Sequence, residues 1–268
     1  MLKHMQDALE AREFVLWYQP KVCLVSGRVL SAEALLRWPQ QDGSFISPET
    51  FIPLAEESGL IAGLGCWVAE QAIADCAAWQ AQGFAGIGVS INVSSVQFRC
   101  VSLSERIADK LGLTGLSPGN LELELTESLL IDDDEAVQQE LARLSRLGVG
   151  MAIDDFGTGY SNISYLSRFQ AQRLKIDKSF IMPLADAAAD DRLVRAMLQI
   201  AASLNFRVVA EGIETQDCLE RLQVLGCSEG QGYLWSPAMP LAAWLDYLAA
   251  NVACAVPPGD WIHAAQGI

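Results

Sequence analysis

Histidine is scarce in this sequence. Only two histidines occur among 268 residues, His4 and His263, and both lie near the ends of the chain. A Ser-His-Asp or Cys-His catalytic group needs a histidine beside its nucleophile, and most zinc sites use histidine or closely spaced cysteines. We therefore expect the chemistry to rely on carboxylates, lysine, arginine, amides, or a metal ion held by oxygen atoms.

Cysteine pairs with metal-binding or redox spacing are also lacking. The chain has seven cysteines, an odd number, and no two of them form a C-x-x-C pair. Scattered cysteines of this kind are typical of reduced thiols that fill the core of a protein. The cysteines thus predict neither a disulfide framework nor a metal site.

Positive charge is low, with 18 lysines and arginines against 33 acidic residues and a formal net charge of −15. This balance argues against a protein that binds long nucleic acid through a basic surface. It leaves room for a small anionic ligand if bound cations lie between carboxylates and phosphate. No unbroken apolar run reaches the roughly 18–20 residues of a membrane span, and residues 1–13 lack the apolar centre of a signal peptide. We expect a cytoplasmic domain with no transmembrane segment.

What the chain does contain is enough apolar sequence for a large core, because 51% of its residues are hydrophobic and 19% are charged. Short apolar segments predict strands at residues 14–24, 29–38, 87–93, 121–125, 149–153, 173–176, 206–209 and 228–233. Helical patterns lie at residues 66–82, 103–111, 135–147, 191–204, 215–225 and 241–250. This alternation predicts parallel strands with helical crossovers. About eight strands in a chain of this length favour a single α/β domain, a TIM-like (β/α)8 barrel, over an open sheet.

Polar residues end most of the predicted strands. They are Asn92, Glu124, Asp154, Asp155, Lys175 and Glu211, and Glu33 lies inside the apolar stretch 29–38. In such barrels the active site lies at the carboxyl ends of the strands. Ionised carboxylates from separate strands can converge there only if cations neutralise them. Oxygen ligands without histidine or cysteine suit Mg²⁺ or Mn²⁺.

Two such ions would favour attack of water on a phosphodiester. In that hypothesis Lys175 orients the water or stabilises negative charge, and Glu211 accepts a proton. Structural roles are the alternative: strand-end acids can cap helices, Glu33 can pair with Arg37 on the same strand face, and Lys175 can be an ordinary buried cation.

Ordered short motifs carry a resemblance to a known family. They are Tyr18-Gln19-Pro20, Glu33-Ala34-Leu35-Leu36-Arg37, Phe51-Ile52-Pro53-Leu54-Ala55-Glu56, Asn92-Val93-Ser94, Glu124-Leu125-Thr126-Glu127, Asp154-Asp155-Phe156-Gly157-Thr158-Gly159-Tyr160-Ser161, Lys175-Ile176-Asp177 and Glu211-Gly212-Ile213-Glu214. Each motif is weak alone, but the ordered set, from about residue 14 to residue 240, resembles the EAL family of cyclic di-GMP phosphodiesterases. The stretch Leu234-Trp235-Ser236-Pro237-Ala238 departs from the family, which more often has Phe and Lys-Pro there.

The resemblance implies roles for individual residues. The implied metal ligands are Glu33, Asn92, Glu124, Asp154 and Asp155, with Asp155 serving the second of two ions. Lys175 would position the attacking water, and Glu211 would be the general base. Implied substrate contacts are Gln19, Arg37, Asp177 and Gln231. Glu127 would anchor the loop of Phe156, Gly157, Thr158, Gly159, Tyr160 and Ser161 and couple it to dimerisation, and Glu214 would support the site from behind.

The family also implies an activity and an organisation. The activity is metal-dependent hydrolysis of cyclic di-GMP to linear 5'-pGpG in bacterial signalling, by a homodimer fused to or regulated by a sensor domain. One antiparallel strand near the start of the barrel would fit the turn at Ser26-Gly27. We expect a linker-like helix at residues 1–13, the EAL domain at 14–250 and a tail at 251–268.

Three other functions compete with this one. The chain could be a catalytically silent cyclic di-GMP receptor, although such proteins usually lack some of the carboxylates, the lysine or the loop motif. It could be a Mg²⁺-dependent barrel enzyme that abstracts a proton beside a carboxylate, with Lys175 as base. That function would leave the Glu33–Arg37 motif unexplained. A purely protein-binding role would leave the carboxylate cluster without a cause.

Overall fold

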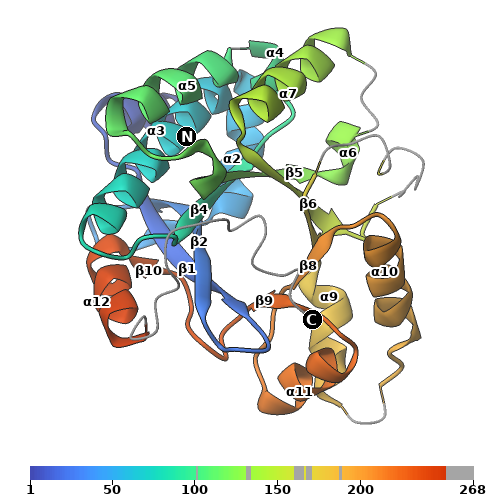
Figure 1. The fold of residues 1–268 in the computed structure, drawn as a ribbon. Helices are drawn as coiled ribbons and strands as arrows, with labels where there is room; N and C mark the ends of the chain where they lie inside the picture. The colour runs from blue at the N-terminus through green and yellow to red at the C-terminus, as the bar shows by residue number, and fades with distance from the viewer. Residues whose placement is uncertain (101, 131–133, 160–165, 167–170, 187–188, 252–268) are drawn as a thin grey trace.

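Eight strands close into a barrel in the computed structural model, which describes residues 1–100, 102–130, 134–159, 166, 171–186 and 189–251. The strands are β1 (Val15–Cys23), β2 (Val29–Pro39), β4 (Gly88–Val93), β5 (Leu121–Thr126), β6 (Gly150–Phe156), β7 (Arg173–Ile176), β8 (Arg207–Ala210) and β9 (Glu229–Gln231). They neighbour one another in that order, and the pairing of β1 with both β2 and β9 closes the ring (Figure 1). Two-residue strands, β3 (Phe45–Ile46) and β10 (Met239–Pro240), add to its edge. The predicted TIM-like α/β barrel is confirmed.

Strand β1 is the antiparallel member of the ring. It runs antiparallel to β2 and β9, whereas the other neighbouring pairs in the ring are parallel. A tight turn joins β1 to β2, in which the Gly27 amide donates to the Cys23 carbonyl at 2.8 Å. Gly27 has φ +68°, a conformation that glycine adopts at little cost. This short connection is possible only for antiparallel strands, because a parallel crossover needs a dozen or more residues.

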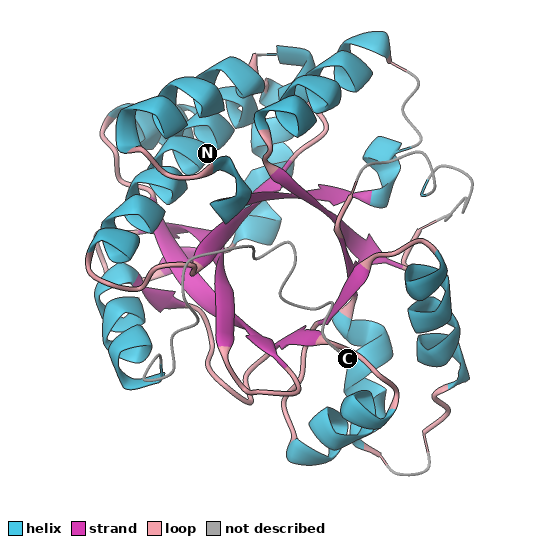
Figure 2. Ribbon diagram, viewed as in Figure 1, coloured by secondary structure: helices cyan, strands magenta, loops and turns pink. Residues whose placement is uncertain are grey.

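Helices surround the strand ring (Figure 2). They are α1 (Leu2–Glu10), α2 (Pro48–Ser58), α3 (Leu60–Ala81), α4 (Gln97–Cys100), α5 (Leu103–Thr114), α6 (Glu127–Leu130), α7 (Glu135–Leu147), α9 (Lys178–Ile181), α10 (Arg192–Ser203), α11 (Gln216–Val224) and α12 (Leu241–Asn251), with 3-10 turns η1 (Pro118–Asn120) and η2 (Met182–Ala185). Residues on the outer side of the strands, such as Leu123 and Ile153, form one core cluster with buried helix residues, such as Ile73. The main core therefore lies between the ring and the helices.

Helix α3 differs from its prediction, because it begins at Leu60 and not at residue 66. Glycines at 63 and 65 lower the intrinsic helix preference of this segment, but packing overrides that preference. A Cβ at Gly65 would lie 1.9 Å from the Gln97 side-chain nitrogen, so the glycine allows the helix to contact α4 closely. By length and composition α3 is apolar enough to cross a membrane, although polar residues such as Glu70 and Asp75 interrupt its apolar sequence. More than half of the helix is buried inside the protein.

Other boundaries shift by a few residues. Helix α5 continues to Thr114 and ends where Gly115 adopts φ +72°. Strand β6 extends to Phe156, beyond the predicted end at residue 153, and β9 is limited to Glu229–Gln231. Helix α1 packs through Met5 and Ala8 into a second core cluster. The division into linker, domain and tail stays a prediction, and residues 252–268 lie outside the described part.

Candidate active site

The inside of the barrel is polar and forms two layers. We call Gln19, Glu33, Asn92, Glu124, Asp154, Lys175, Glu211 and Gln231 the upper layer, which lies toward the carboxyl ends of the parallel strands. The lower layer consists of Glu122, Arg173, Arg207 and Glu229. Alternation along the strands explains this arrangement, because successive side chains of a strand face opposite sides of the sheet. In β5 the leucines join the outer core, while Glu122 and Glu124 bind cations inside the ring.

Lys175 is the centre of the upper layer. Its side chain is 2% exposed, and its Nζ lies 2.5 Å from Glu124 Oε2 and 2.8 Å from Glu211 Oε1. The same nitrogen lies 3.0 Å from Asp154 Oδ1 and 3.6 Å from Glu33 Oε2. The sequence prediction that these side chains converge is confirmed. One ammonium group thus serves four carboxylates, so the cluster carries more negative than positive charge.

Amide side chains complete one side of this layer. Asn92 donates to Glu33 Oε1 at 2.7 Å, and Gln231 donates both to Glu33 Oε2 and to Gln19 Oε1 at 2.8 Å. Gln19 in turn donates to the Ser236 carbonyl at 3.1 Å. The buried Oε1 of Gln231 has no hydrogen-bond partner within the described part of the chain. A buried acceptor of this kind is costly unless something donates to it, which suits a bound ligand.

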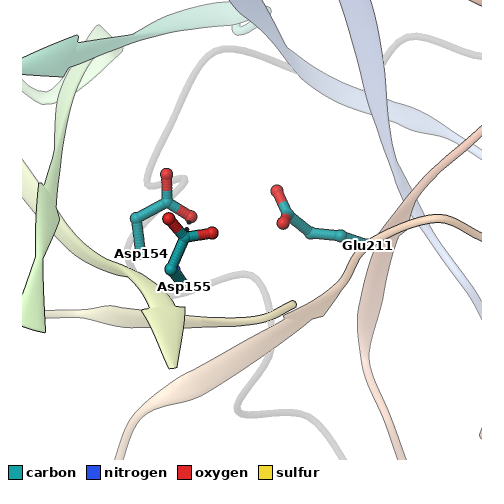
Figure 3. Close-up of side chains that lie close together, drawn as sticks. All are labelled: Asp154, Asp155 and Glu211. Carbon is teal, nitrogen blue, oxygen red and sulfur yellow. Dashed lines mark hydrogen bonds between the residues drawn. The ribbon is translucent and has the colours of Figure 1, made fainter. Parts of the chain in front are cut away.

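Three carboxylates at one end of the barrel come close enough to share a cation. Ligand oxygens of Asp154, Asp155 and Glu211 lie within 4.8 Å of one another. In Figure 3 the Glu211 side chain extends from its own strand end toward the two aspartates at the end of β6. Asp155 has φ +54°, and its amide donates to Asp154 Oδ1 at 2.9 Å. Asp154 is buried while Asp155 is exposed, so the pair spans the boundary between the barrel interior and solvent.

The electrostatics of the upper layer reflect its excess of carboxylates. Burial raises the pKa of Glu211 to about 7, although Lys175 opposes the shift. Burial also raises the pKa of Glu33, with Glu124 adding to the effect, and burial raises that of Asp154. Burial acts the same way on Glu124, but Lys175 and Lys21 outweigh it and hold the pKa of Glu124 well below its ordinary value. Carboxyl groups with raised pKa values in one cleft are typical of functional sites.

Other predicted site residues lie at the rim. Arg37 donates to the Leu36 carbonyl at 2.9 Å, and its guanidinium lies 5.5 Å from the ring centre of Trp17. The alternative in which Glu33 pairs with Arg37 is wrong, because inward-facing Glu33 is engaged by amides and Lys175. Asp177 caps α9 by accepting from the Ser179 amide at 3.0 Å.

The loop after β6 contacts Glu127. The Gly157 amide donates to Glu127 Oε1 at 3.2 Å, and a Cβ at Gly159 would lie 2.8 Å from Glu127 Oε2. Gly157 has φ +99°, and a side chain there would meet Phe180 and Met197. Phe156 is buried and Thr158 is exposed; Tyr160 and Ser161 lie outside the described residues. Glu214 is exposed in the connection after β8, and its supporting role stays a prediction.

Sequence reasoning missed the residues beneath this site. Lys21 of β1, which is fully buried, contacts both Glu124 and Glu122. Arg173 lies 2.5 Å from Glu122 and 2.7 Å from Glu229, and Arg207 lies 3.5 Å from Glu229. A signal was available, since charged or polar residues recur with a period of two in β1, β5 and β7. That period predicts that they share one face of a strand.

Comparison with known proteins agrees with this geometry. The sequence model of the EAL domain family matches residues 2–238. The chain is 41% identical over 253 residues to the bifunctional diguanylate cyclase/cyclic di-GMP phosphodiesterase MucR of Pseudomonas aeruginosa, covering 94% of this chain and 36% of that protein. It is 42% identical over 249 residues to the cyclic di-GMP phosphodiesterase PA2567 of the same organism, covering 91% of this chain and 42% of that protein.

Solved structures give the same result. The PaMucR phosphodiesterase in complex with c-di-GMP matches with a TM-score of 0.85 and 41% identity, over 91% of this chain and 98% of that one. The chain spans well under half the length of the two curated relatives. Because the family match extends over nearly the whole barrel, the chain belongs to the EAL domain family.

Proposed function

We propose that this chain is a metal-dependent phosphodiesterase that hydrolyses cyclic di-GMP to linear 5'-pGpG. The observation that carries the proposal is the upper layer, in which three buried carboxylates and the partly exposed Glu211 share Lys175, and in which the ligand oxygens of Asp154, Asp155 and Glu211 lie within 4.8 Å of one another. The names of the relatives that match over more than nine tenths of the chain support the choice of substrate.

The residues of the upper layer fit divalent cations. Their donor atoms are carboxylate and amide oxygens, which are the ligands of Mg²⁺ and Mn²⁺. Glu33, Asn92, Glu124 and Asp154 would hold one ion, and Asp155 would hold a second. Bound ions of this kind polarise phosphodiester oxygens and make water a stronger nucleophile. The excess of carboxylates over Lys175 is the electrostatic reason why the site would take cations.

The chain's own residues would act as follows. Glu211, whose pKa of about 7 suits a general base near neutral pH, would accept a proton from the attacking water. Lys175 would orient that water and stabilise negative charge on the phosphoryl oxygens. The water oxygen forms a bond to phosphorus while the bond from phosphorus to the 3' oxygen breaks. The 3' oxygen takes a proton from solvent and leaves as a hydroxyl group, and Glu211 releases the proton that it accepted to solvent.

Rim and amide side chains would hold the substrate. Arg37 can present two N–H groups to a phosphate, and Gln19, Gln231 and Asp177 would bind the remainder of the nucleotide. The free Oε1 of Gln231 supports this role, since it can accept a hydrogen bond from the substrate. We also propose that the chain acts in the cytoplasm as a homodimer and, given the length of its relatives, under control of a sensor domain.

The test is incubation of the purified chain with cyclic di-GMP and Mg²⁺ or Mn²⁺, followed by chromatography. We expect pGpG with either metal and none with EDTA. The Glu211→Gln variant serves as a matched control, because it removes the base and keeps the size of the side chain. Micromolar binding without any pGpG would indicate the receptor function instead. A chain that neither binds nor cleaves cyclic di-GMP contradicts the proposal.

A further inference from the structure

Lys21 connects the two layers of the barrel interior. Its side chain has no exposed area, and its Nζ contacts Glu124 Oε1 and lies 3.3 Å from Glu122 Oε1. The other oxygen of Glu124 lies 2.5 Å from Lys175. The two oxygens of Glu124 are thus bound by two different lysines. Lys21, which also binds the lower layer, binds Oε1, and Lys175 binds Oε2.

The lower layer fixes the position of Lys21. Arg173 binds the second oxygen of Glu122 at 2.5 Å and also binds Glu229 at 2.7 Å. These side chains are buried on β5, β7 and β9 inside the ring. Glu122 is therefore held by Arg173 on one oxygen and presents the other to Lys21. A charged group with fixed partners on a strand is a more precise support than one on a loop.

We propose that Lys21 is a positioning residue that holds the Glu124 carboxylate in the orientation needed to bind a divalent cation, a role that rests on the proposed function. Lys21 binds Oε1 and thereby directs Oε2 toward Lys175 and the Asp154 side of the layer. Without Lys21 the carboxylate can rotate toward the interior space that the ammonium group now fills. Outer partners that orient a metal ligand in this way typically affect metal affinity 10–100-fold.

The sign of the effect separates this role from a simple charge effect. Lys21 is a cation, so its removal leaves the site more negative and by Coulomb attraction alone makes divalent cations bind more tightly. Loss of an orienting contact makes them bind more weakly. A residue that only stabilises the fold changes the unfolding temperature and leaves metal affinity unchanged. The three roles therefore predict three different results.

The experiment is a Mn²⁺ titration of the substrate-free chain, with free Mn²⁺ measured by electron paramagnetic resonance. For Lys21→Met we expect Mn²⁺ affinity about 10–100-fold lower than that of the unaltered chain. Arg207→Met is the matched control, because it removes a lower-layer cation that contacts Glu229 and not Glu124. Its Mn²⁺ affinity should stay within about threefold of the unaltered chain, which is little on the scale of an outer partner. Unchanged or tighter binding by Lys21→Met overturns the proposal.

A second variant covers the case in which Lys21→Met does not fold. Glu122→Gln keeps Lys21 but replaces the carboxylate that holds it, and circular dichroism checks folding. Removal of a lower-layer negative charge weakens cation binding by itself, so Glu229→Gln, which removes a carboxylate bound by Arg173 and Arg207, is the control. We expect Mn²⁺ binding weaker in Glu122→Gln than in Glu229→Gln, with the KM for cyclic di-GMP unchanged. A folded Glu122→Gln chain that binds Mn²⁺ as tightly as Glu229→Gln contradicts the proposal. If the unaltered chain binds Mn²⁺ but releases no pGpG, hydrolysis fails as the proposed function, while the metal binding on which the role of Lys21 rests remains, and the Lys21→Met titration decides that role. If the unaltered chain binds no Mn²⁺, both fail.

Discussion

The two layers of the barrel interior both contain buried charged side chains but differ in charge balance. In the lower layer two carboxylates, Glu122 and Glu229, face two guanidinium groups, Arg173 and Arg207. Lys21 lies between the layers and contacts both Glu122 and Glu124. In the upper layer four carboxylates share Lys175. The lower layer is electrostatically complete by itself, whereas the upper layer needs additional positive charge.

The pKa directions at Glu122 and Asp154 illustrate this difference. Burial raises the pKa of a carboxyl group, but Arg173 and Lys21 outweigh it at Glu122 and lower that pKa. At Asp154 burial prevails over Lys175, and the pKa is raised. Charged groups that are paired in the interior serve as structure, and those left with an excess of one sign are suited to bind an ion. We therefore infer that the lower layer stabilises the fold and that the upper layer carries the chemistry.

The largest effect should come from Asp154→Asn. This change keeps the size of the side chain but removes a charge that lies 3.0 Å from Lys175 and within the group of three convergent carboxylates. We expect turnover of cyclic di-GMP to fall to background because the site loses a cation ligand, as measured by pGpG release with saturating Mn²⁺. Asp190→Asn is the control, since this exposed aspartate pairs with nearby Arg192 at the surface. Full turnover by Asp154→Asn would end its assignment as a ligand.

Glu211→Gln should have the second-largest effect. Its carboxylate, with a pKa of about 7, is the proposed base, and removal of a general base usually costs about 10²–10⁴-fold in rate. We expect kcat to fall by that factor while cyclic di-GMP binding, measured by calorimetry, changes little. A Glu211→Gln chain that loses binding as much as turnover would instead make Glu211 a ligand for the cation, as its closeness to Asp154 and Asp155 also allows.

Much of this arrangement could be predicted from the sequence, for identifiable reasons. Strand ends rich in carboxylates placed Glu124, Asp154 and Glu211 at one end of the barrel, because parallel strands share their carboxyl edge. The lower layer was not predicted because Lys21 and Arg173 lie within or at the start of strand segments whose apolar residues dominate the pattern, and not at their carboxyl ends.

The sequence predicted which end of the barrel the site residues occupy, but not which side chains contact one another. Nothing in the local sequence says that Lys21 on β1 contacts Glu122 and Glu124 on β5, about a hundred positions away. That contact depends on closure of the barrel, in which β1 pairs with β2 and β9 and its inward side chains face those of β5. The helix start at Leu60 was missed for a related reason, since the packing of Gly65 against Gln97 is a tertiary contact.

Arg173→Met tests the structural side of the comparison. The change leaves Glu122 and Glu229 buried with one cation fewer, and breaking a buried ion pair from one side typically costs about 3–5 kcal/mol. We expect the free energy of unfolding, measured with urea in EDTA, to fall by that amount. Arg207→Met should cost less, because Arg173 still binds Glu229 at 2.7 Å. Equal losses for the two variants would contradict the assignment of Arg173 as the centre of the lower layer.

Glu127→Ala should have the smallest effect, because Glu127 acts on the site through the loop after β6. Its Oε1 accepts a hydrogen bond from the Gly157 amide at 3.2 Å, two residues beyond Asp155. A hydrogen bond to a charged group contributes about 1.5–3 kcal/mol. Only part of that free energy would affect the position of Asp155, because the bond is made to Gly157. We expect kcat to fall about tenfold, a change of about 1.4 kcal/mol, with the lower layer unaffected and the urea midpoint nearly unchanged. Light scattering on the same samples tests the coupling to dimerisation. An unaltered dimer with full activity would show that the contact between Glu127 and the loop is structural. Loss of the dimer together with activity would connect the upper layer to the subunit interface.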